Sequence, residues 1–208
     1  MTGTPGPKDL VRRGYDAVSY RYRDDADSDA SERGAWIGRL LTQLSAGASV
    51  LDLGCGCGIP ASRDLAAAGL SVTGVDLSDV QVGRAREFVP SATFLRADAS
   101  EVDFPPDSFD AVICLYMLIH LPLDEQPPLL AKVASWLRPG GRFVATTGHR
   151  AWTGTEENWL GGGAPMWWSH ADAATYREWL ADAGFVLDAE EFVAEGDGGH
   201  PLFWCRRP

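Results

Sequence analysis

The chain has 208 residues, of which 45% are hydrophobic, and its 29 acidic and 18 basic residues give a formal net charge of −11. This length is sufficient for one full hydrophobic core, while the acidic balance disfavours binding to a phosphate backbone. The chain contains no run of about 18 apolar residues, so we predict no membrane span. The polar N-terminus lacks the apolar region of a secretory signal. We therefore expect a cytoplasmic protein with no nucleic-acid or membrane partner.

The N-terminal part combines a tyrosine-containing stretch, Tyr15 to Arg23, with an acidic run from Asp24 to Asp29. Amphipathic tyrosines serve equally to cover a ligand or to pack a surface helix on its domain. Residues 31–46 carry Trp36 and several leucines at helical spacing, which predicts a helix that belongs to the core.

The most specific pattern is VLDLGCGCG, residues 50–58. Its apolar start predicts a buried strand, and the alternate glycines allow a tight turn and close approach of a ligand to the backbone. A helix beginning at Pro60 would direct unpaired N–H groups to the same place, which favours a nucleotide-like ligand. The dinucleotide pattern G-x-G-x-x-G fails at its third glycine, where the chain has Ile59.

The following segments alternate between strand and helix patterns, which predicts an α/β fold. A second strand, 71–77, contains Asp76, which lies 22 residues beyond Gly54 and is suited to bind both hydroxyls of a ribose. Ser78 is the predicted N-cap of a helix over 79–89. A third strand over 92–97 precedes Asp98.

An almost wholly apolar fourth strand is predicted over 109–118, as expected for a strand covered on both faces. A helix over 122–137 follows, and Leu137-Arg-Pro-Gly-Gly-Arg-Phe143 leads into a fifth strand. A helix over 171–183 precedes two strands, 185–193 and 202–206.

Residues 149–170 contain four of the eight tryptophans and three successive glycines. This insertion has two interpretations. It lines an apolar ligand pocket as a mobile cover, or it is a lid that packs on the body through its own tryptophans. The four cysteines form no C-x-x-C pair, which favours reduced thiols.

The stretch from Asp52 to Gly58, D-x-G-x-G-x-G, resembles the first motif of class I S-adenosylmethionine (SAM)-dependent methyltransferases, and three further motifs follow in the family's order up to Phe143. The resemblance implies a Rossmann-like, doubly wound α/β sheet of about seven strands, with the last strand antiparallel and helices on both faces. It also implies SAM as cofactor, with S-adenosylhomocysteine as its product. Residues 1–30 would form a lid, and 31–208 a single domain with the Trp-rich insertion at 149–170.

The same resemblance assigns candidate site residues. Those expected to bind the cofactor are Tyr20, Asp52, Gly54, Cys55, Gly56, Asp76, Leu77, Gln81, Asp98, Ala99 and Leu115. Those expected to bind the methyl acceptor are Tyr116, Trp152, Trp159, Trp167, Trp168 and His170. His120, which follows the fourth strand, is the candidate general base, with a purely structural role as its alternative. No grouping of histidine, cysteine or carboxylate has the spacing of a metal site.

The sequence thus predicts a SAM-dependent methyltransferase that acts on an oxygen, nitrogen or sulfur atom of a small aromatic or apolar acceptor. Two alternatives remain. One is a SAM-binding protein without methyl transfer, either a regulator or a catalyst of another reaction. The other is an NAD-dependent oxidoreductase, which Ile59 and Asp98 disfavour. Neither the identity of the acceptor nor the oligomeric state follows from the sequence.

Overall fold

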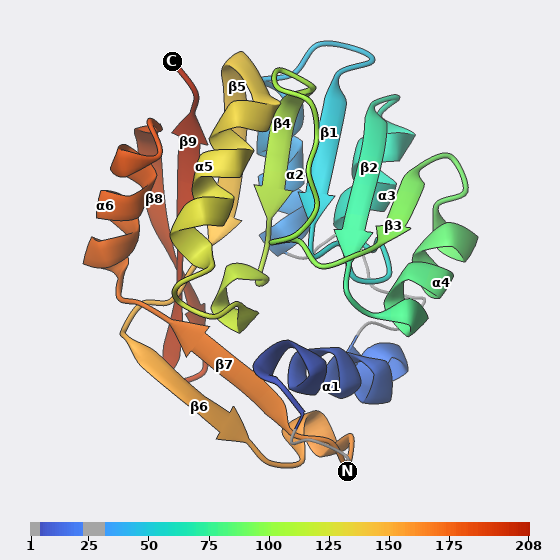
Figure 1. Cartoon of the computed structure of the whole chain (residues 1–208). Coiled ribbons are helices and arrows are strands. Elements are labelled where there is room, and N and C mark those ends of the chain that lie inside the picture. Colours follow the sequence, from blue (N-terminus) through green and yellow to red (C-terminus); the bar gives the residue numbers. More distant parts are fainter. Residues whose placement is uncertain (1–4, 23–31) are drawn as a thin grey trace.

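The computed structural model describes residues 5–22 and 32–208, and its centre is a seven-stranded sheet in the order β3-β2-β1-β4-β5-β9-β8 (Figure 1). The strands of this sheet are β1 (Ser49–Leu53), β2 (Ser71–Asp76), β3 (Thr93–Arg96), β4 (Phe109–Cys114), β5 (Leu137–Thr146), β8 (Val186–Glu195) and β9 (Gly198–Arg206). Strands β1 to β5 are parallel, whereas β9 pairs antiparallel with both β5 and β8. The predicted fold class is confirmed.

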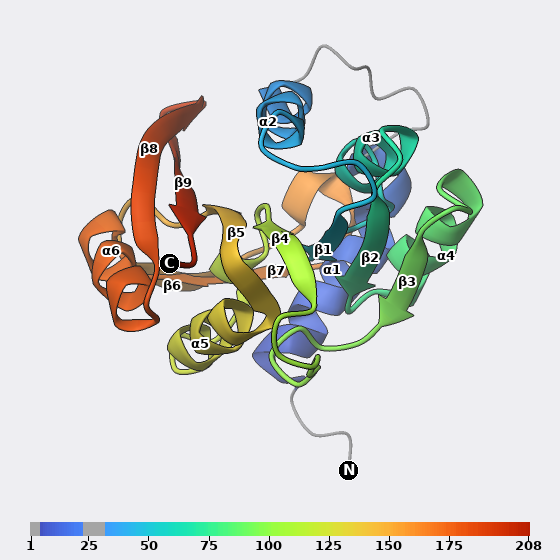
Figure 2. The same ribbon diagram turned by 90° about the horizontal axis from the view of Figure 1, so that it is seen from above.

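Helices cover both faces of the sheet, with α2 and α3 on one side and α5 and α6 on the other (Figure 2). The helices are α1 (Pro7–Tyr22), α2 (Glu32–Leu41), α3 (Ala61–Ala67), α4 (Asp79–Phe88), α5 (Gln126–Trp136) and α6 (Ala173–Asp182), with the short 3-10 turns η1 (Leu118–His120) and η2 (Trp159–Gly161). Two apolar clusters fill the space between helices and sheet, one around Trp136 and Phe143 and the other around Trp36 and Ile37. Among the described residues, no helix is long and apolar enough to cross a membrane.

The strand order reverses between β1 and β4, which are neighbours although β2 and β3 intervene in the chain. At such a reversal the connections leave to opposite sides and open a crevice at the carboxyl ends of the strands. The fold therefore places the glycine-rich turn after β1 and the residues after β4 at one edge of the sheet.

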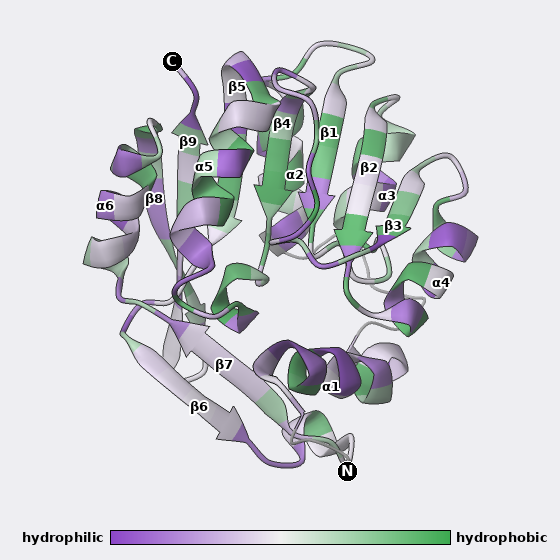
Figure 3. Cartoon of the chain, viewed as in Figure 1, coloured by the Kyte–Doolittle hydropathy of each residue, from purple (hydrophilic) through white to green (hydrophobic). Residues whose placement is uncertain are grey.

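A second layer closes this edge. Helix α1 runs across the carboxyl ends of the strands, and the Trp-rich insertion forms an antiparallel hairpin of β6 (Trp152–Glu156) and β7 (Met166–His170) beside it (Figure 1). Val11 and Val18 of α1 pack with Trp159 and Met166 in a small apolar cluster. Figure 3 shows β4 hydrophobic over most of its length, whereas β6 and β7 are mostly of intermediate hydropathy.

The fourth strand is shorter than the predicted 109–118, because it ends at Cys114. Tyr116 has a positive φ of 65°, and its N–H donates to the Thr146 hydroxyl instead of to a strand. Helix α5 begins at Gln126 after a turn at Pro122, not at 122 as predicted. The acidic run 24–29 lies outside the described residues.

Candidate active site

A cavity of about 130 Å³ lies at the carboxyl ends of the central strands, beneath α1. The residues predicted to bind the cofactor that line it are Asp52, Gly54, Cys55, Gly56, Asp76, Leu77, Gln81, Asp98, Ala99 and Leu115. These residues come from the end of β1 and the turn after it, from the ends of β2, β3 and β4, and, for Gln81, from the first turn of α4. Separate segments of the chain thus converge on one cavity.

The glycine-rich turn brings backbone to the cavity surface. Gly54 has a φ of +74°, and a Cβ added there would lie 2.5 Å from the Cβ of Met117. Both the conformation and the contact therefore exclude a side chain. The N–H of Gly56 donates to Asp76 Oδ2 at 2.9 Å, which fixes the turn against the end of β2.

Asp76 is held by backbone donors on both oxygens, from Gly56 to Oδ2 and from Ser78 to Oδ1, each at 2.9 Å. Burial raises its pKa, and these two backbone hydrogen bonds oppose the rise. Each carboxylate oxygen accepts more than one hydrogen bond. Asp76 is thus oriented to accept further donors, such as a pair of ribose hydroxyls.

Asp52 is the second buried acid of this cavity. It accepts from Ser62 Oγ at 2.6 Å. Burial raises its pKa to about 7, with the Ser62 hydrogen bond opposing the rise and the charge of Asp76 adding to it. Among the described residues, neither Asp52 nor Asp76 forms an ion pair, so a positively charged ligand would stabilise both carboxylates.

Asp98, in contrast, has a cationic partner. Lys8 Nζ lies 2.5 Å from Asp98 Oδ2 and 2.6 Å from Glu125 Oε2. The pKa of Asp98 is lowered because hydrogen bonds from Lys8 and Ser100 together outweigh its partial burial. This ion pair ties the start of α1 to the far end of the cavity.

Further along α1, two polar side chains bind residues that line the cavity. The Ser78 hydroxyl donates to Asp16 Oδ1 at 2.5 Å, and the Ser19 hydroxyl donates to Gln81 Oε1 at 2.9 Å. Helix α1 is therefore bonded to the cavity wall at its start and along its length.

A second cavity of about 280 Å³ adjoins the first. It is lined mainly by rings, among them the predicted acceptor residues Tyr116, Trp159 and Trp168. The residues that line both cavities are Tyr15, Tyr22, Arg33, Tyr116 and His120. A ligand in one cavity would meet a ligand in the other at these five side chains.

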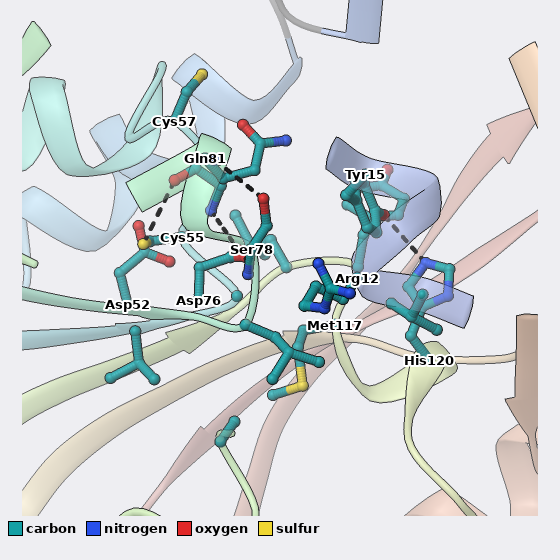
Figure 4. A pocket seen from close by; sticks show the side chains of 18 of the residues that line it. Arg12, Tyr15, Asp52, Cys55, Cys57, Asp76, Ser78, Gln81, Met117 and His120 are labelled. Carbon is teal, nitrogen blue, oxygen red and sulfur yellow. Dashed lines mark hydrogen bonds between the residues drawn. The ribbon is translucent and has the colours of Figure 1, made fainter. Parts of the chain in front are cut away.

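His120 is buried at this junction, facing Tyr15 of α1 (Figure 4). Its Nδ1 lies 2.9 Å from the carbonyl oxygen of Trp167, and because a carbonyl only accepts, Nδ1 carries the proton. Nε2 then offers its lone pair to the Tyr15 hydroxyl at 3.0 Å. Burial lowers the pKa of His120 to about 4, partly offset by the hydrogen bond to Trp167, so the ring is neutral near pH 7.

Tyr116 separates the two cavities in a constrained conformation. Its φ of 65° lies in the left-handed region, and its N–H is held by Thr146 Oγ1 at 2.5 Å. The Arg33 guanidinium lies 4.4 Å from its ring centroid, and the ring of His200 packs edge-on at 5.3 Å. Non-glycine residues in this conformation cluster at functional sites, where the surroundings hold them.

Some predicted residues lie elsewhere. Tyr20 is 67% exposed and does not line the first cavity. Its ring lies against Arg84 instead, because the face of α1 that carries Val11, Tyr15 and Val18 turns inward. On the hairpin, Trp152 of β6 is 47% exposed, and neither it nor His170 lines the second cavity.

Trp167 contacts the site through its backbone carbonyl, which accepts a hydrogen bond from His120 Nδ1, and its side chain does not line the second cavity. Its neighbour Trp168 lines the cavity, as expected where successive side chains of a strand point to opposite faces.

Several residues that line the second cavity were not predicted from the sequence, among them Tyr15, Tyr22, Arg33 and Glu195. Tyr15 and Tyr22 are seven residues apart and share the apolar face of α1 with Val18, so helical spacing could have identified them. Arg33 and Glu195 come from a helix and a strand end that carry no motif, and no signal in the sequence marks them.

Among the described residues, no group of three His, Cys, Asp or Glu side chains is placed to hold a metal ion. All four cysteines are buried. Burial raises the pKa of Cys55 and of Cys114, so neither thiol is activated as a nucleophile.

Residues 50–141 match the family model of a methyltransferase domain. They span the glycine-rich turn, Asp76, Asp98 and His120. This match identifies a methyltransferase domain of the class I SAM-dependent kind in residues 50–141, and the family and cofactor are those predicted from the sequence. The buried carboxylate of Asp52 and the partly buried carboxylate of Asp76, which two backbone donors hold at the end of β2, fit SAM, which is a cationic nucleoside.

Among curated proteins, the 27-O-demethylrifamycin SV methyltransferase of Amycolatopsis mediterranei is 34% identical over 161 residues, which cover 67% of this chain and 58% of that protein. The chain spans about half the length of the curated relatives it matches. These relatives include both sterol 24-C-methyltransferases and O-methyltransferases, so they do not define the acceptor atom.

Two solved structures illustrate the breadth of the fold. Magnesium protoporphyrin IX methyltransferase from Synechocystis, with bound S-adenosylhomocysteine, has a TM-score of 0.75 at 22% identity and covers 98% of this chain and 100% of its own. The [4+2]-cyclase SpnF has a TM-score of 0.71 at 21% identity and covers 99% of this chain and 97% of its own. At these identities the likeness shows the fold alone.

Proposed function

We propose that this protein transfers the methyl group of SAM to an oxygen, nitrogen or sulfur atom of a small aromatic or apolar acceptor. The observation that carries the proposal is the meeting of two cavities, one acidic and glycine-rich and one aromatic, at His120 Nε2. The electrophilic methyl group is supplied by the sulfonium of SAM. The remaining task of the protein is to align an acceptor atom and exclude water.

Side chains of the first cavity have distinct roles in holding the cofactor. Asp76 accepts the ribose hydroxyls, and Asp98 and Ala99 lie where the adenine is expected. Arg33 lines both cavities and hydrogen-bonds Tyr22 and Tyr116. Among the described residues it forms no ion pair, so its guanidinium can also bind the carboxylate of the methionine part. Asp52 adds negative charge close to the positive end of the ligand.

In the second cavity, an acceptor hydroxyl takes the place of the Tyr15 hydroxyl at His120 Nε2. The Trp167 carbonyl keeps the histidine in the tautomer that accepts a proton. Transfer to an oxygen acceptor then moves its proton to Nε2 as the oxygen–methyl bond forms. A thiolate acceptor needs no base.

A second candidate is SAM binding without methyl transfer. The low pKa of His120, about 4, makes it a weak base, and general bases work best with a pKa near the operating pH. Cofactor affinity with no methylation of any acceptor would identify this function.

The deciding experiment is calorimetric titration with SAM, S-adenosylhomocysteine and NAD, using protein freed of carried-over ligand. We expect micromolar binding of the two SAM-type ligands and none of NAD. A screen of small phenols, amines and thiols, followed by mass spectrometry, then identifies methylated products. Binding of NAD instead, or of no ligand, would overturn the proposal.

A further inference from the structure

The acceptor cavity has a polar end that the methyl-transfer step does not use. Glu195 and His200 line the second cavity but not the first, so they lie on the side away from the cofactor. They face each other across the turn between β8 and β9. His120, by contrast, lines both cavities and stands at the reacting end.

The polar end presents two hydrogen-bond acceptors. His200 Nδ1 lies 2.8 Å from the carbonyl oxygen of Thr147, so Nδ1 carries the proton and Nε2 has a free lone pair. Glu195 Oε2 lies 3.8 Å from this Nε2, beyond hydrogen-bond distance. Glu195 is also a hydrogen-bond partner of the Tyr116 hydroxyl, and its carboxylate has further lone pairs, so a donor placed between Glu195 and His200 would bind both.

The walls between the two ends are aromatic and fixed. Trp159 packs edge-on against Tyr15 at 5.2 Å and against Trp168 at 6.0 Å, and the ring of His200 meets Tyr116 at 5.3 Å. The Trp168 Nε1–H is buried and has no hydrogen-bond partner among residues 5–22 and 32–208, so it can donate to an acceptor atom of a ligand. Such walls select a flat, largely apolar body.

We infer that the acceptor is a ring compound with a hydrogen-bond donor, a hydroxyl or a protonated amine, at the end opposite the methylated atom. His200 Nε2 and the Glu195 carboxylate hold this donor. Arg33 does not compete for this role, because its guanidinium lies over Tyr116 beside the cofactor cavity. The inference rests on the proposed function and adds the substrate class of the same site.

The test compares three matched probes by calorimetry in the presence of S-adenosylhomocysteine, where no methyl transfer occurs. All are naphthols, and they differ only in the substituent on the other ring: a hydroxyl, an aminomethyl group or a methoxy group. We expect the hydroxyl and aminomethyl probes to bind about tenfold more tightly than the methoxy probe, since a hydrogen bond to a charged acceptor is lost.

Two variants assign the preference to its residues. Glu195→Gln removes the charge and should reduce the preference for the aminomethyl probe, whereas His200→Phe keeps a ring against Tyr116 and should reduce the preference for the hydroxyl probe. Glu190→Gln is the matched control, because Glu190 is on the same strand but pairs with Arg177 outside the cavity. Circular dichroism verifies that each variant is folded.

Equal affinities for the three probes in the wild type, no binding of any probe, or a preference unchanged in both variants would overturn the inference. Failure of the proposed function is distinguishable from these outcomes, because it appears as loss of S-adenosylhomocysteine binding in the same calorimeter. The probe comparison is then repeated on the protein alone, and equal affinities there would again refute the polar end as a recognition site.

Discussion

The two adjoining cavities are built in opposite ways. The cofactor cavity is formed by backbone turns and short polar side chains at the ends of β1, β2 and β3, with Gly54 and Asp76 at its centre. The acceptor cavity is formed mainly by large rings and two charged groups from α1, α2, the β6–β7 hairpin, the segment after β4 and the ends of β8 and β9 that flank their turn. The first cavity depends mainly on the sheet, whereas the second combines sheet ends with elements added to the edge of the sheet.

This difference indicates that the fold itself provides the cofactor site, whereas specificity for the acceptor depends on the elements added to the fold. Backbone turns at the ends of parallel strands offer N–H groups and carboxylates at fixed positions, so they suit a ligand shared by many proteins. Rings on a hairpin and a separate helix vary without disturbing the sheet, since loops and surface elements tolerate change. We therefore expect variants in the two cavities to separate cofactor affinity from acceptor turnover.

The largest difference between the effect on acceptor turnover and the effect on cofactor affinity is expected for His120, which lines both cavities. His120→Gln should lower the rate of methyl transfer to an oxygen acceptor by about 10²–10⁴-fold, the usual contribution of a general base, with unchanged affinity for SAM. The base acts in its unprotonated form and burial lowers its pKa to about 4. The wild-type rate should thus persist from pH 8 down to about 5 and fall only as the pH approaches 4. A decline centred near 6.5 would contradict this assignment.

On the cofactor side, Asp52→Asn should change the pH dependence of stability. The folded pKa of Asp52, about 7, lies above the ordinary value of 3.8, so ionisation destabilises the native state progressively as the pH rises from about 4 to 7. The variant should exceed the wild type in unfolding free energy by at most about 4 kcal/mol at pH 8. This advantage should disappear towards pH 4, as measured by urea unfolding at several pH values. If the unfolding free energies of the two proteins depended on pH in the same way, the assignment of a buried ionising group to Asp52 would be wrong.

Asp76→Ala should weaken binding of SAM by about 1–3 kcal/mol, through loss of hydrogen bonds to a charged group. Asp79→Ala is the control, because Asp79 lies in the first turn of α4 with its side chain 71% exposed. Calorimetry on both variants measures the effect. Equal affinities for SAM would remove Asp76 from the ribose site.

The smallest effect is expected at the aromatic wall. Trp168→Ala should raise the KM for the acceptor by about tenfold, or about 1.4 kcal/mol, and leave SAM affinity unchanged. Trp152→Ala is the control, because Trp152 lies on the paired strand β6 and does not line the cavity. This variant should leave the steady-state kinetic constants unchanged. A comparable loss in both variants would mean that the hairpin acts only through its folding.

The two cavities also differ in how well the sequence predicts them. All predicted cofactor residues except Tyr20 line the first cavity, because each lies in, or shortly after, a strand whose pattern is local. Tyr20 lies outside this cavity, because the choice among the three tyrosines of α1 depends on which helix face turns inward. Trp152 and Trp168 lie on the paired strands β6 and β7, and only the way the hairpin packs decides that Trp168 lines the second cavity and Trp152 does not. Arg33 reaches the site from a helix without a motif. Such placements depend on long-range packing, which a single sequence does not encode in any local pattern.

Helix α1 is bonded to Asp98, Ser78 and Gln81, which all line the cofactor cavity. Under the proposed function, we expect that exchange of S-adenosylhomocysteine for fresh SAM requires these bonds to break and re-form. Opening of one amphipathic helix would then compete with chemistry as the slow step of the cycle. Weakening a single contact, such as that of Lys8, would shorten the residence time of the product before it altered the reaction itself.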